Sequence, residues 1–422
     1  MKDDLNPPVP RREFMLGSGA ALLAAALPAT YQRLASAGES RSSDVAVPVR
    51  TITAGVTVDP ANPEAAVKRA DAFLGAARRR LEAAGLTVQT TRIVTQPQAD
   101  YARDMPVAAF GELLQVLQAA AQPHSLAIGP RWIDDDAELT IAPAVMAATL
   151  GISSTIVIGS AATDIQRPAV DAAARVIRRI ADTDAAANFN FAAIANVAPG
   201  IPFFPAGYHD GGGDRFAVGL EAAGLFLSVC RERQDPVAAG PALAAAYAQV
   251  LRRVAALCAD IERDTGWKFG GIDPTPAQWG TNSIGAAVEA LTGAPFGAPG
   301  TLAACRTLTG VVRSVPVRQT GYRGLFLPPM EDATLARRAY DYFSLDALLA
   351  YSSVCGTGLD TVALPGDASI PDLRRILLDV ASLAVKLDKP LTARLFPVPG
   401  RSAGESTGPV GDLFPMKILR IR

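Results

Sequence analysis

Hydrophobic and polar positions alternate along most of this chain in patterns that predict strands and helices in turn. Residues 49–58 (VRTITAGVTV) alternate with the period of two typical of a strand, and the helical pattern that opens at Pro63 ends at Gly85. The same pattern predicts later strands at residues 87–95, 125–130, 154–160, 188–197, 216–221, 322–329 and 392–398, and later helices at 105–122, 137–150, 168–183, 236–264 and 370–387.

This alternation favours parallel strands buried between helices, with functional groups on loops at the strand ends. No stretch between residues 49 and 398 has the composition of a linker, and no internal repeat is evident. We therefore expect a single large α/β domain over residues 49–400, compatible with a closed or nearly closed barrel. A C-terminal tail of residues 401–422 is expected to pack on it.

The N-terminus predicts export. Arg11 and Arg12 precede a weakly apolar run at residues 17–29, and residues 35–37 (ASA) fit a small-residue cleavage site. This pattern resembles a twin-arginine signal over residues 1–37, and a short Ala-rich amphipathic helix is the alternative. The run is short for a membrane span, and no later stretch offers about 18 unbroken apolar residues. We expect a periplasmic or otherwise exported protein without a stable membrane span.

Charge and composition narrow the class of partner. The 422 residues carry 40 Lys and Arg against 41 Asp and Glu, and no segment gathers five or more like charges. Neither a nucleic-acid footprint nor an acidic tail is visible, so the expected partner is a small molecule. Two histidines and four cysteines without CxxC spacing argue against structural zinc. The oligomeric state is left open.

Three of the four cysteines lie in apolar, helix-like sequence. Cys230, Cys258 and Cys305 are expected to be small buried hydrophobic residues rather than reactive thiols. Because disulfides persist in an oxidising compartment, a bridge between Cys230 and Cys258 is an open alternative.

The fourth cysteine lies in the stretch that most resembles a site, YSSVCGTGLDTVALPGD. Cys355 follows an apolar helical run, glycines stand at the next and third positions, and Asp360 and Asp367 follow within what is expected to be a loop. Glycines allow positive φ and close backbone approach to a ligand, and they would expose the thiol. We therefore favour a functional Cys355 over a packed one.

Three other segments present chemical groups at expected strand ends. His209 ends an aromatic loop and is either a proton shuttle or a loop cap. Asp273 stands in GGIDP, where a simple Asx turn is the alternative. Glu331 and Asp332 open an expected helix, where a carboxylate is also favoured by the helix dipole. Such paired carboxylates can divide acid and base duties or hold a hard cation.

Five segments of the chain resemble, in order, the family known as domain of unknown function 711. They are FFPAGYH, KFGGIDP, GAPGTLAACRTLTGVVRSVPVRQTGYRGLFLPPMED, YSSVCGTGLDTVALPGD and LTARLFPVPG, and the resemblance covers residues 49–400. It implies a ten-stranded α/β barrel similar to that of pyruvate formate-lyase and the anaerobic ribonucleotide reductases. It implies little about the reaction.

In enzymes of that wider fold, a loop cysteine inside the barrel becomes a thiyl radical through a glycyl radical near the C-terminus. Cys355 could occupy the comparable place. None of the tail glycines lies in the arginine-valine-x-glycine context of those enzymes, and an exported protein would expose a glycyl radical to oxygen. We expect no glycyl radical. The glycines concerned are Gly400, Gly404, Gly408 and Gly411.

The leading functional hypothesis is an exported hydrolase or lyase. In it Cys355 is the nucleophile or acid–base group, His209 or Asp360 assists, and Arg394 or Arg323 binds an anionic substrate group. In a second hypothesis, a divalent cation carries out the catalysis. In a third, the protein is a periplasmic ligand-binding protein that does not convert its ligand. The carboxylates considered for that cation are Asp273, Glu331, Asp332, Asp360 and Asp367, with His209 as an optional ligand.

Overall fold

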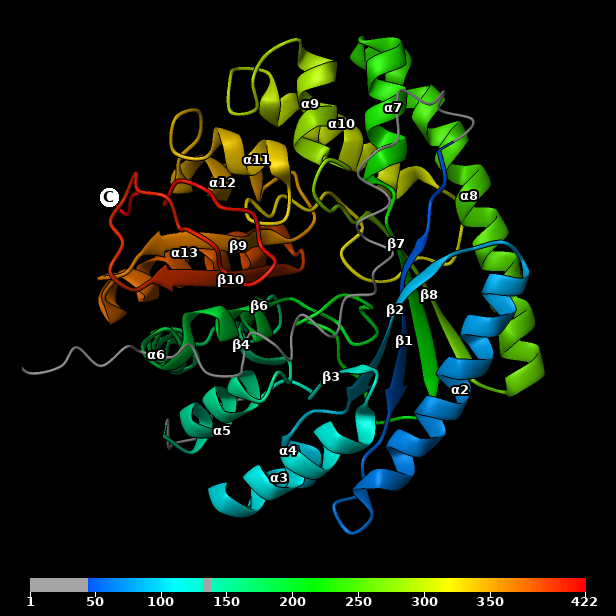
Figure 1. The fold of residues 1–422 in the computed structure, drawn as a ribbon, viewed down its shortest axis with the longest axis vertical. Coiled ribbons are helices and arrows are strands. Elements are labelled where there is room, and N and C mark those ends of the chain that lie inside the picture. Colours follow the sequence, from blue (N-terminus) through cyan, green and yellow to red (C-terminus); the bar gives the residue numbers. More distant parts are fainter. Residues whose placement is uncertain (1–44, 132–137) are drawn as a thin grey trace, which may run out of the picture.

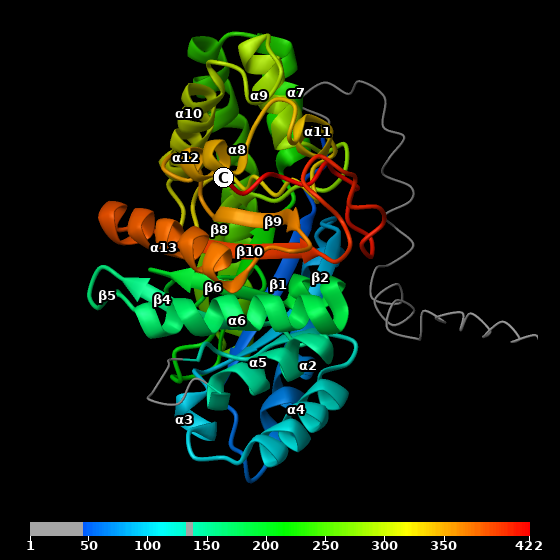
Figure 2. The same ribbon diagram turned by 90° about the vertical axis from the view of Figure 1, so that its left-hand side faces the viewer.

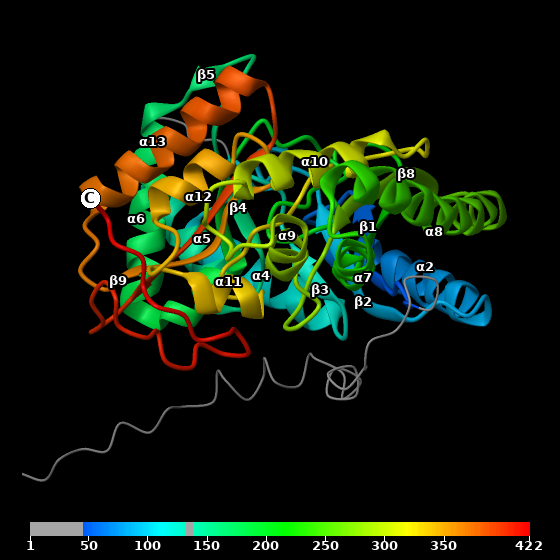
Figure 3. The ribbon, with the colours of Figure 1, turned by 90° about the horizontal axis from the view of Figure 1, so that it is seen from above.

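The computed structural model describes residues 45–131 and 138–422, so the export signal expected at residues 1–37 lies outside the described residues. The described chain forms a single mixed α/β body with two five-stranded sheets (Figure 1). Helices cover the outer faces of both sheets. In Figure 3 they lie at opposite ends of the molecule, α6 and α13 beyond one sheet and α2 and α8 beyond the other.

The first sheet has the strand order β3-β2-β1-β7-β8. Strands β1, β2 and β3 are mutually parallel, β7 is antiparallel to β1, and β8 is parallel to β7. Helices α2 and α8 pack against its outer face. The bounds are β1 (Val49–Val56), β2 (Val88–Thr95), β3 (Ser125–Ala127), β7 (Arg215–Leu220), β8 (Lys268–Pro276), α2 (Pro63–Ala83), α4 (Val107–Ala121) and α8 (Pro236–Thr265).

The second sheet has the order β5-β4-β6-β10-β9. Strands β4 and β6 are parallel, β10 is antiparallel to β6, and β9 is parallel to β10. Helices α6 and α13 lie on the near side of this sheet in Figure 2. The bounds are β4 (Ser154–Ser160), β5 (Asp164–Ile165), β6 (Phe191–Ala195), β9 (Gly358–Pro365), β10 (Leu391–Val398), α6 (Arg167–Asp184) and α13 (Ile370–Leu387).

Short elements connect these strands. The bounds are α3 (Ala99–Ala102), α5 (Glu138–Thr149), the 3-10 helix η3 (Ala185–Asn190), α7 (Ala223–Arg233), α9 (Ile284–Thr292), α10 (Thr301–Ser314), α11 (Ala333–Arg338) and α12 (Leu345–Tyr351).

Isolated contacts, rather than full strands, join the two sheets at their edges. After β3 the chain bridges to β4 through Ala127 with Ser153 and Arg131 with Ile156. At the other edge, Gln319 bridges to β8, and Leu325 O accepts a hydrogen bond from Gly356 N at 2.7 Å, just before β9. The expected single ten-stranded barrel is therefore observed as two sheets, and its likeness to pyruvate formate-lyase stays a prediction.

Alternate residues of the strands face the helices and the space between the sheets. In β1, Ile52 and Ala54 belong to the main apolar core, whereas the Thr53 hydroxyl donates to Pro202 O at 2.8 Å. The aromatic segment 200–209 thus runs between the sheets. Its Phe203 packs so closely on Gly219 that a Cβ there would lie 2.5 Å from the ring. With Tyr322 and Phe326, Phe203 belongs to a second apolar cluster.

Three local predictions differ from the structure. Residues 188–197, expected as one strand, begin as η3 and become β6 only at Phe191. Residues 322–329 form no strand. The stretch after Cys355, expected as a loop, is the fully buried strand β9, because Leu359, Val362 and Leu364 pack in the main core.

The C-terminal residues 401–422 lie against the body (Figure 1, red). Phe414 N donates to Met330 O at 2.7 Å, and Leu419 N donates to Ala363 O at 3.2 Å. Among the described helices, α8 alone is long and apolar enough to cross a membrane by length and composition. Helix α8 also packs on β8 and α10, as the long helices of an α/β body do, so this test gives weak evidence of a span.

Replacing Gly356 by Ala is expected to lower the free energy of unfolding by about 1–3 kcal/mol, because a Cβ there would lie 2.7 Å from the carbonyl carbon of Gly324. Chemical denaturation measures this change. Gly213→Ala is the matched control, since nothing lies within 4 Å of its Cβ position. Equal stabilities of the two variants would contradict the close packing of the 324 and 356 backbones.

Candidate functional site

Cys355 is buried in the apolar core. Its side chain is 0% exposed, and its thiol acts electrostatically on that of Cys305. The expectation of an exposed thiol is therefore wrong. The glycines after it serve protein packing instead of ligand approach: Gly356 meets the Gly324 backbone, and Gly358, at φ +94°, approaches Thr392 O. All four cysteines are free, so the alternative of a Cys230 to Cys258 bridge is wrong as well.

A buried lysine holds the backbone around Cys355. Lys389 Nζ donates to Cys355 O at 2.6 Å and to Ser352 O at 2.7 Å. Burial lowers the pKa of Lys389, because its charged form has lost water. The ammonium thereby fixes the end of α12 against the start of β9, which is a structural role.

His209 acts as a loop cap in the structure. Its backbone N donates to Thr95 O at 2.9 Å, and its Nε2 lies 3.1 Å from Gly212 O. Burial lowers the pKa of His209, although the Gly212 carbonyl opposes that change. A cavity of about 20 Å³ adjoins the ring, which is room for about one water molecule. The His209 ring thus lies on the side of the molecule formed by β1, β2 and β7.

The expected thiol, imidazole and carboxylate do not meet. No hydrogen bond or ion pair in residues 45–131 and 138–422 joins Cys355, His209 and Asp360. Each of the three contacts a different set of elements. The shared, solvent-accessible site expected from the sequence is therefore not assembled.

Asp273 and Asp332 have structural partners for both oxygens. Asp273 accepts hydrogen bonds from Tyr322 N at 2.8 Å and from the Thr275 hydroxyl at 2.6 Å. It also accepts hydrogen bonds from Thr275 N and Arg323 N. Asp332 caps α11 and accepts from the Ser283 hydroxyl at 2.6 Å. Burial raises the pKa of both carboxyls, and these hydrogen bonds oppose the rise. Asp273 therefore has the turn-forming role, and Asp332 the helix-start role, that were the alternatives to a functional one.

Two further predicted residues lie at the surface. Asp367 is exposed in the turn before α13, and Arg323 is exposed with its carbonyl accepting from Arg313 Nε at 3.1 Å. Neither side chain contacts the other candidate groups in the described structure. An anion-binding role for Arg323 at a shared site has no support from this arrangement.

Asp360, Arg394 and Glu331 form a buried charged group, here called the Arg394 cluster. Arg394 Nε donates to Asp360 Oδ1 at 2.7 Å, and its Nη2 donates to Glu331 Oε1 at 2.5 Å. The guanidinium carbon lies 4.6 Å from the Phe189 ring centre. The Arg394 side chain is 5% exposed, Asp360 10% and Glu331 13%, so Glu331 is the member most open to solvent.

A β-bulge places this cluster. Ala393 pairs with Leu359 and Leu395 with Val362, so that Asp360 and Thr361 together oppose Arg394. Thr361 has φ +43°, a left-handed conformation that a β-branched residue rarely adopts and that costs of order 1–3 kcal/mol. Backbone strain of this kind gathers at functional sites.

The surroundings of Glu331 perturb the pKa of its carboxyl. Burial raises its pKa above the ordinary glutamate value of 4.5, Arg394 opposes this change, and Asp360 adds to it. Arg50 of β1 and Arg92 of β2 also oppose the rise, which places their positive charge near Glu331. The segment before α11 thus directs one carboxyl into a strongly cationic environment.

This environment also contains three residues that were not predicted from the sequence: Arg50, Arg92 and Tyr322. The Tyr322 hydroxyl hydrogen bonds to the Thr392 hydroxyl, and Asp360, Asp273 and Arg394 all act on it electrostatically. The sequence did contain a signal for Arg50 and Arg92, because each lies within a predicted strand of a buried sheet. Charged residues are rarely buried without a partner.

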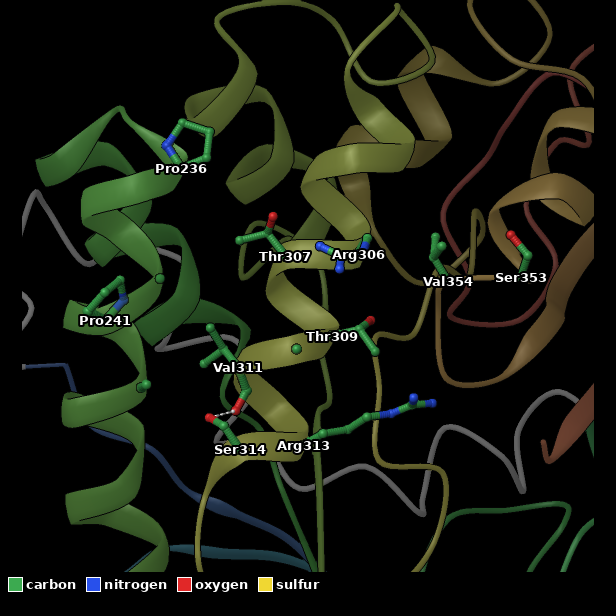
Figure 4. Close-up of a pocket in the computed structure, with 13 residues that line it drawn as sticks. Pro236, Pro241, Arg306, Thr307, Thr309, Val311, Arg313, Ser314, Ser353 and Val354 are labelled. Carbon is green, nitrogen blue, oxygen red and sulfur yellow. Dashed lines mark hydrogen bonds between the residues drawn. The ribbon is translucent and has the colours of Figure 1, made fainter. Parts of the chain in front are cut away.

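A separate hollow lies away from the Arg394 cluster. It is an open groove of about 660 Å³ between the first turns of α8 and the exposed face of α10 (Figure 4). Arg306 and Arg313 border it, and Ser353 and Val354 reach it, but its lining has no carboxylate, imidazole or thiol. The charged side chains of the Arg394 cluster, in contrast, lie within hydrogen-bond distance of one another.

Comparisons with known proteins give a family. A family model described as Uncharacterised ACR (DUF711) matches residues 43–408. A UPF0210 protein of Pyrobaculum arsenaticum is 29% identical over 346 residues, which cover 77% of this chain and 75% of that protein. A UPF0210 protein of Pyrobaculum aerophilum is 31% identical over 271 residues, covering 62% and 58%. One of Oenococcus oeni is 29% identical over 279 residues, covering 63% and 62%.

In these last two comparisons the chain spans about three fifths of the relative's length. The names of these relatives describe no reaction or ligand. The function must therefore be argued from the residues of the site.

The native protein is expected to show no thiol that reacts with an aromatic disulfide reagent, and four after denaturation, because all four cysteines are buried. Burial raises the pKa of Cys230 and Cys258 to about 12, which suppresses their reactive thiolate form. Absorbance of the released thiolate counts the groups. One rapidly modified thiol in the native state, mapped to Cys355 by mass spectrometry, would restore the nucleophile hypothesis.

Proposed function

The chain belongs to the DUF711 family, and we propose that it is a small-molecule enzyme, a hydrolase or lyase, in which Glu331 exchanges a proton with an anionic substrate. The observation that carries this proposal is the Arg394 cluster: a carboxyl with a raised pKa, held 2.5 Å from a buried guanidinium beside a strained bulge.

Each member of the cluster has a role in this proposal. Glu331, the most exposed of the three, gives a proton to a leaving group or takes one from the substrate. Arg394 orients Glu331, and Asp360 holds Arg394 through its Nε. The positive charge of Arg50 and Arg92 offsets negative charge on the substrate or on the reacting atoms.

The donor set supports this role better than a divalent cation. Asp273 and Asp332 use both carboxylate oxygens for N–H and O–H donors, and Asp360 and Glu331 are paired with Arg394. No group of three or more His, Cys, Asp or Glu side chains within the described ranges has metal-binding geometry. A cation would have to displace these partners.

Glu331→Gln is expected to reduce turnover about 10²- to 10⁴-fold, since glutamine cannot transfer the proton. Purified protein is incubated with a small-molecule extract of cells, and mass spectrometry follows compounds that disappear or form. In the unaltered protein, the pH limb that reports Glu331 should lie above the ordinary value of 4.5, because its pKa is raised. This limb should vanish in the variant.

Asp367→Asn is the matched control, because Asp367 is exposed and lies outside the cluster. It should leave turnover unchanged, whereas Asp360→Asn should impair it. Undiminished turnover by Glu331→Gln would refute the proton-transfer role. A compound that is bound and released unchanged would instead identify a ligand-binding protein.

We also propose export through a twin-arginine pathway, which rests on the sequence of residues 10–37. Replacing both Arg11 and Arg12 by Lys is expected to leave the protein in the cytoplasm of a host that has this pathway, because the paired arginines are the recognised feature. Cell fractionation with immunodetection measures this. Arg33→Lys, beyond the apolar run, is the control, and equal export of both variants would contradict the proposal.

A further inference from the structure

The open hollow of about 660 Å³ in Figure 4, here called the α8–α10 groove, has two arginines on its border that no carboxylate of its lining neutralises. Arg306 and Arg313 are both exposed. In the part of the chain that the structure describes, neither guanidinium takes part in an ion pair. Arg313 Nε donates to Arg323 O at 3.1 Å, and its two terminal nitrogens remain available. This border of the groove therefore carries uncompensated positive charge.

Between these arginines lies a threonine whose hydroxyl has no hydrogen-bond partner. Thr309 lines the groove and is 5% exposed, and its Oγ1 is unpartnered. A helical threonine commonly donates to the carbonyl three or four residues earlier, and Thr307, on the same helix, donates to Ala303 O at 3.1 Å. Thr309 makes no such bond, although a buried hydroxyl without a partner destabilises the fold. It can therefore donate to a ligand without losing a bond to the helix.

Helical spacing places these three side chains on one face of α10. Arg306 precedes Thr309 by three residues and Arg313 follows it by four. Residues at these spacings are neighbours on a helix surface, with Cβ atoms about 5–6 Å apart. Figure 4 shows Thr309 and Arg313 projecting from the same side of α10, toward Val354. Two guanidiniums and one hydroxyl can thus reach a single anionic group.

A glycine within α10 leaves open space in the same groove. Gly310 lies inside α10 and lines the groove, and a Cβ there would meet nothing within 4 Å. Glycine lowers helix stability relative to alanine, and no neighbouring atom of the described residues explains its presence here. A ligand that approaches the helix backbone would explain it. Pro241 and Val311 add apolar lining that suits an organic group.

We propose that the α8–α10 groove binds a phosphate monoester of a small organic molecule, with its phosphate on Arg306, Thr309 and Arg313 and its organic part over Gly310. Such a phosphate carries a charge of about −1.5 to −2 at neutral pH and three terminal oxygens, which match two guanidiniums and one hydroxyl. A carboxylate, with one charge and two oxygens, would leave part of this set unused. The groove shares no residue with the Arg394 cluster, so this inference is independent of the proposed function.

The test measures binding to the purified protein by titration calorimetry in a phosphate-free buffer. Phenyl phosphate and inorganic phosphate are the probes. Benzoate is the matched ligand control, because it keeps the ring and replaces the phosphate by a carboxylate. Phenyl phosphate is expected to bind at a single site at millimolar concentration or below, and more tightly than inorganic phosphate, because its ring buries apolar surface. Benzoate should bind about tenfold more weakly or less tightly still, since it carries a smaller charge.

Arg306→Gln and Arg313→Gln should each weaken phenyl phosphate about tenfold or more, the loss expected for one hydrogen bond between charged groups. Thr309→Val keeps the side-chain shape and removes the hydroxyl. It should weaken the ester while the unfolding midpoint stays or rises, because the unpartnered group is gone. Arg252→Gln, an exposed arginine of α8 outside the groove, is the matched control and should bind like the unaltered protein.

Gly310→Leu tests the groove itself. It should abolish binding by filling the open space, and it should not lower the unfolding midpoint, because leucine favours a helix and its Cβ meets no neighbour.

The inference is overturned if neither phosphate probe binds, if benzoate binds as tightly as phenyl phosphate, or if the two arginine variants and Thr309→Val keep full affinity. An equal loss in Arg252→Gln would overturn it in favour of nonspecific attraction to positive charge. Binding to vesicles that contain phosphatidic acid, without binding of phenyl phosphate, would overturn it in favour of a lipid headgroup.

Discussion

The buried guanidinium of Arg394 is the interaction on which the interior of this protein depends. An isolated charge in such a place costs several kcal/mol, so the fold must bring opposite charges to it. Asp360 does so from the neighbouring strand β9, through a bulge that holds Thr361 at positive φ. Glu331 does so from the turn before α11, which Asp332 fixes with its hydrogen bonds to Ser283, Thr334 and Leu335. The adjacent carboxylates of Glu331 and Asp332 therefore have different roles. Asp332 holds the turn, and Glu331 faces the Arg394 guanidinium.

The aromatic segment 200–209 explains why so small a group of charges can lie between two sheets. Its Phe203 fills the space that Gly219 leaves open and meets the Phe326 ring edge to face at 4.9 Å. Apolar filling of this kind excludes water from most of the interior and leaves the polar groups near Glu331 as the place where charge is concentrated. Burial of Glu331 itself raises the pKa of its carboxyl, and the charge of Asp360 adds to this rise.

Sequence periodicity predicted the elements that carry their own signals. Helix α13 occupies the predicted residues 370–387, where Ser369 and Asp372 form a capping box, and β4 occupies the predicted 154–160. The failures share a physical cause. Strand β9 was hidden because Gly358 and Asp360 are rare in strands, and both are explained only by tertiary contacts: Gly358 by the approach of Thr392 O, and Asp360 by Arg394. A glycine can indicate a position where no side chain fits. The sequence alone does not show whether a ligand or another part of the backbone fills that space.

The stretch around Cys355 matters for the site even though its sulfur is buried. Lys389 holds the carbonyls of Ser352 and Cys355, and Gly356 is fixed to Leu325 O, so the chain enters β9 at one defined position. Two residues after Gly358 begins the strand, Asp360 meets Arg394. Displacing that entry by one residue would turn Asp360 toward the helices and leave the guanidinium with Glu331 alone. The residues around Cys355 thus influence the Arg394 cluster by setting the register of β9. Their sequence is explained by this backbone geometry rather than by thiol chemistry.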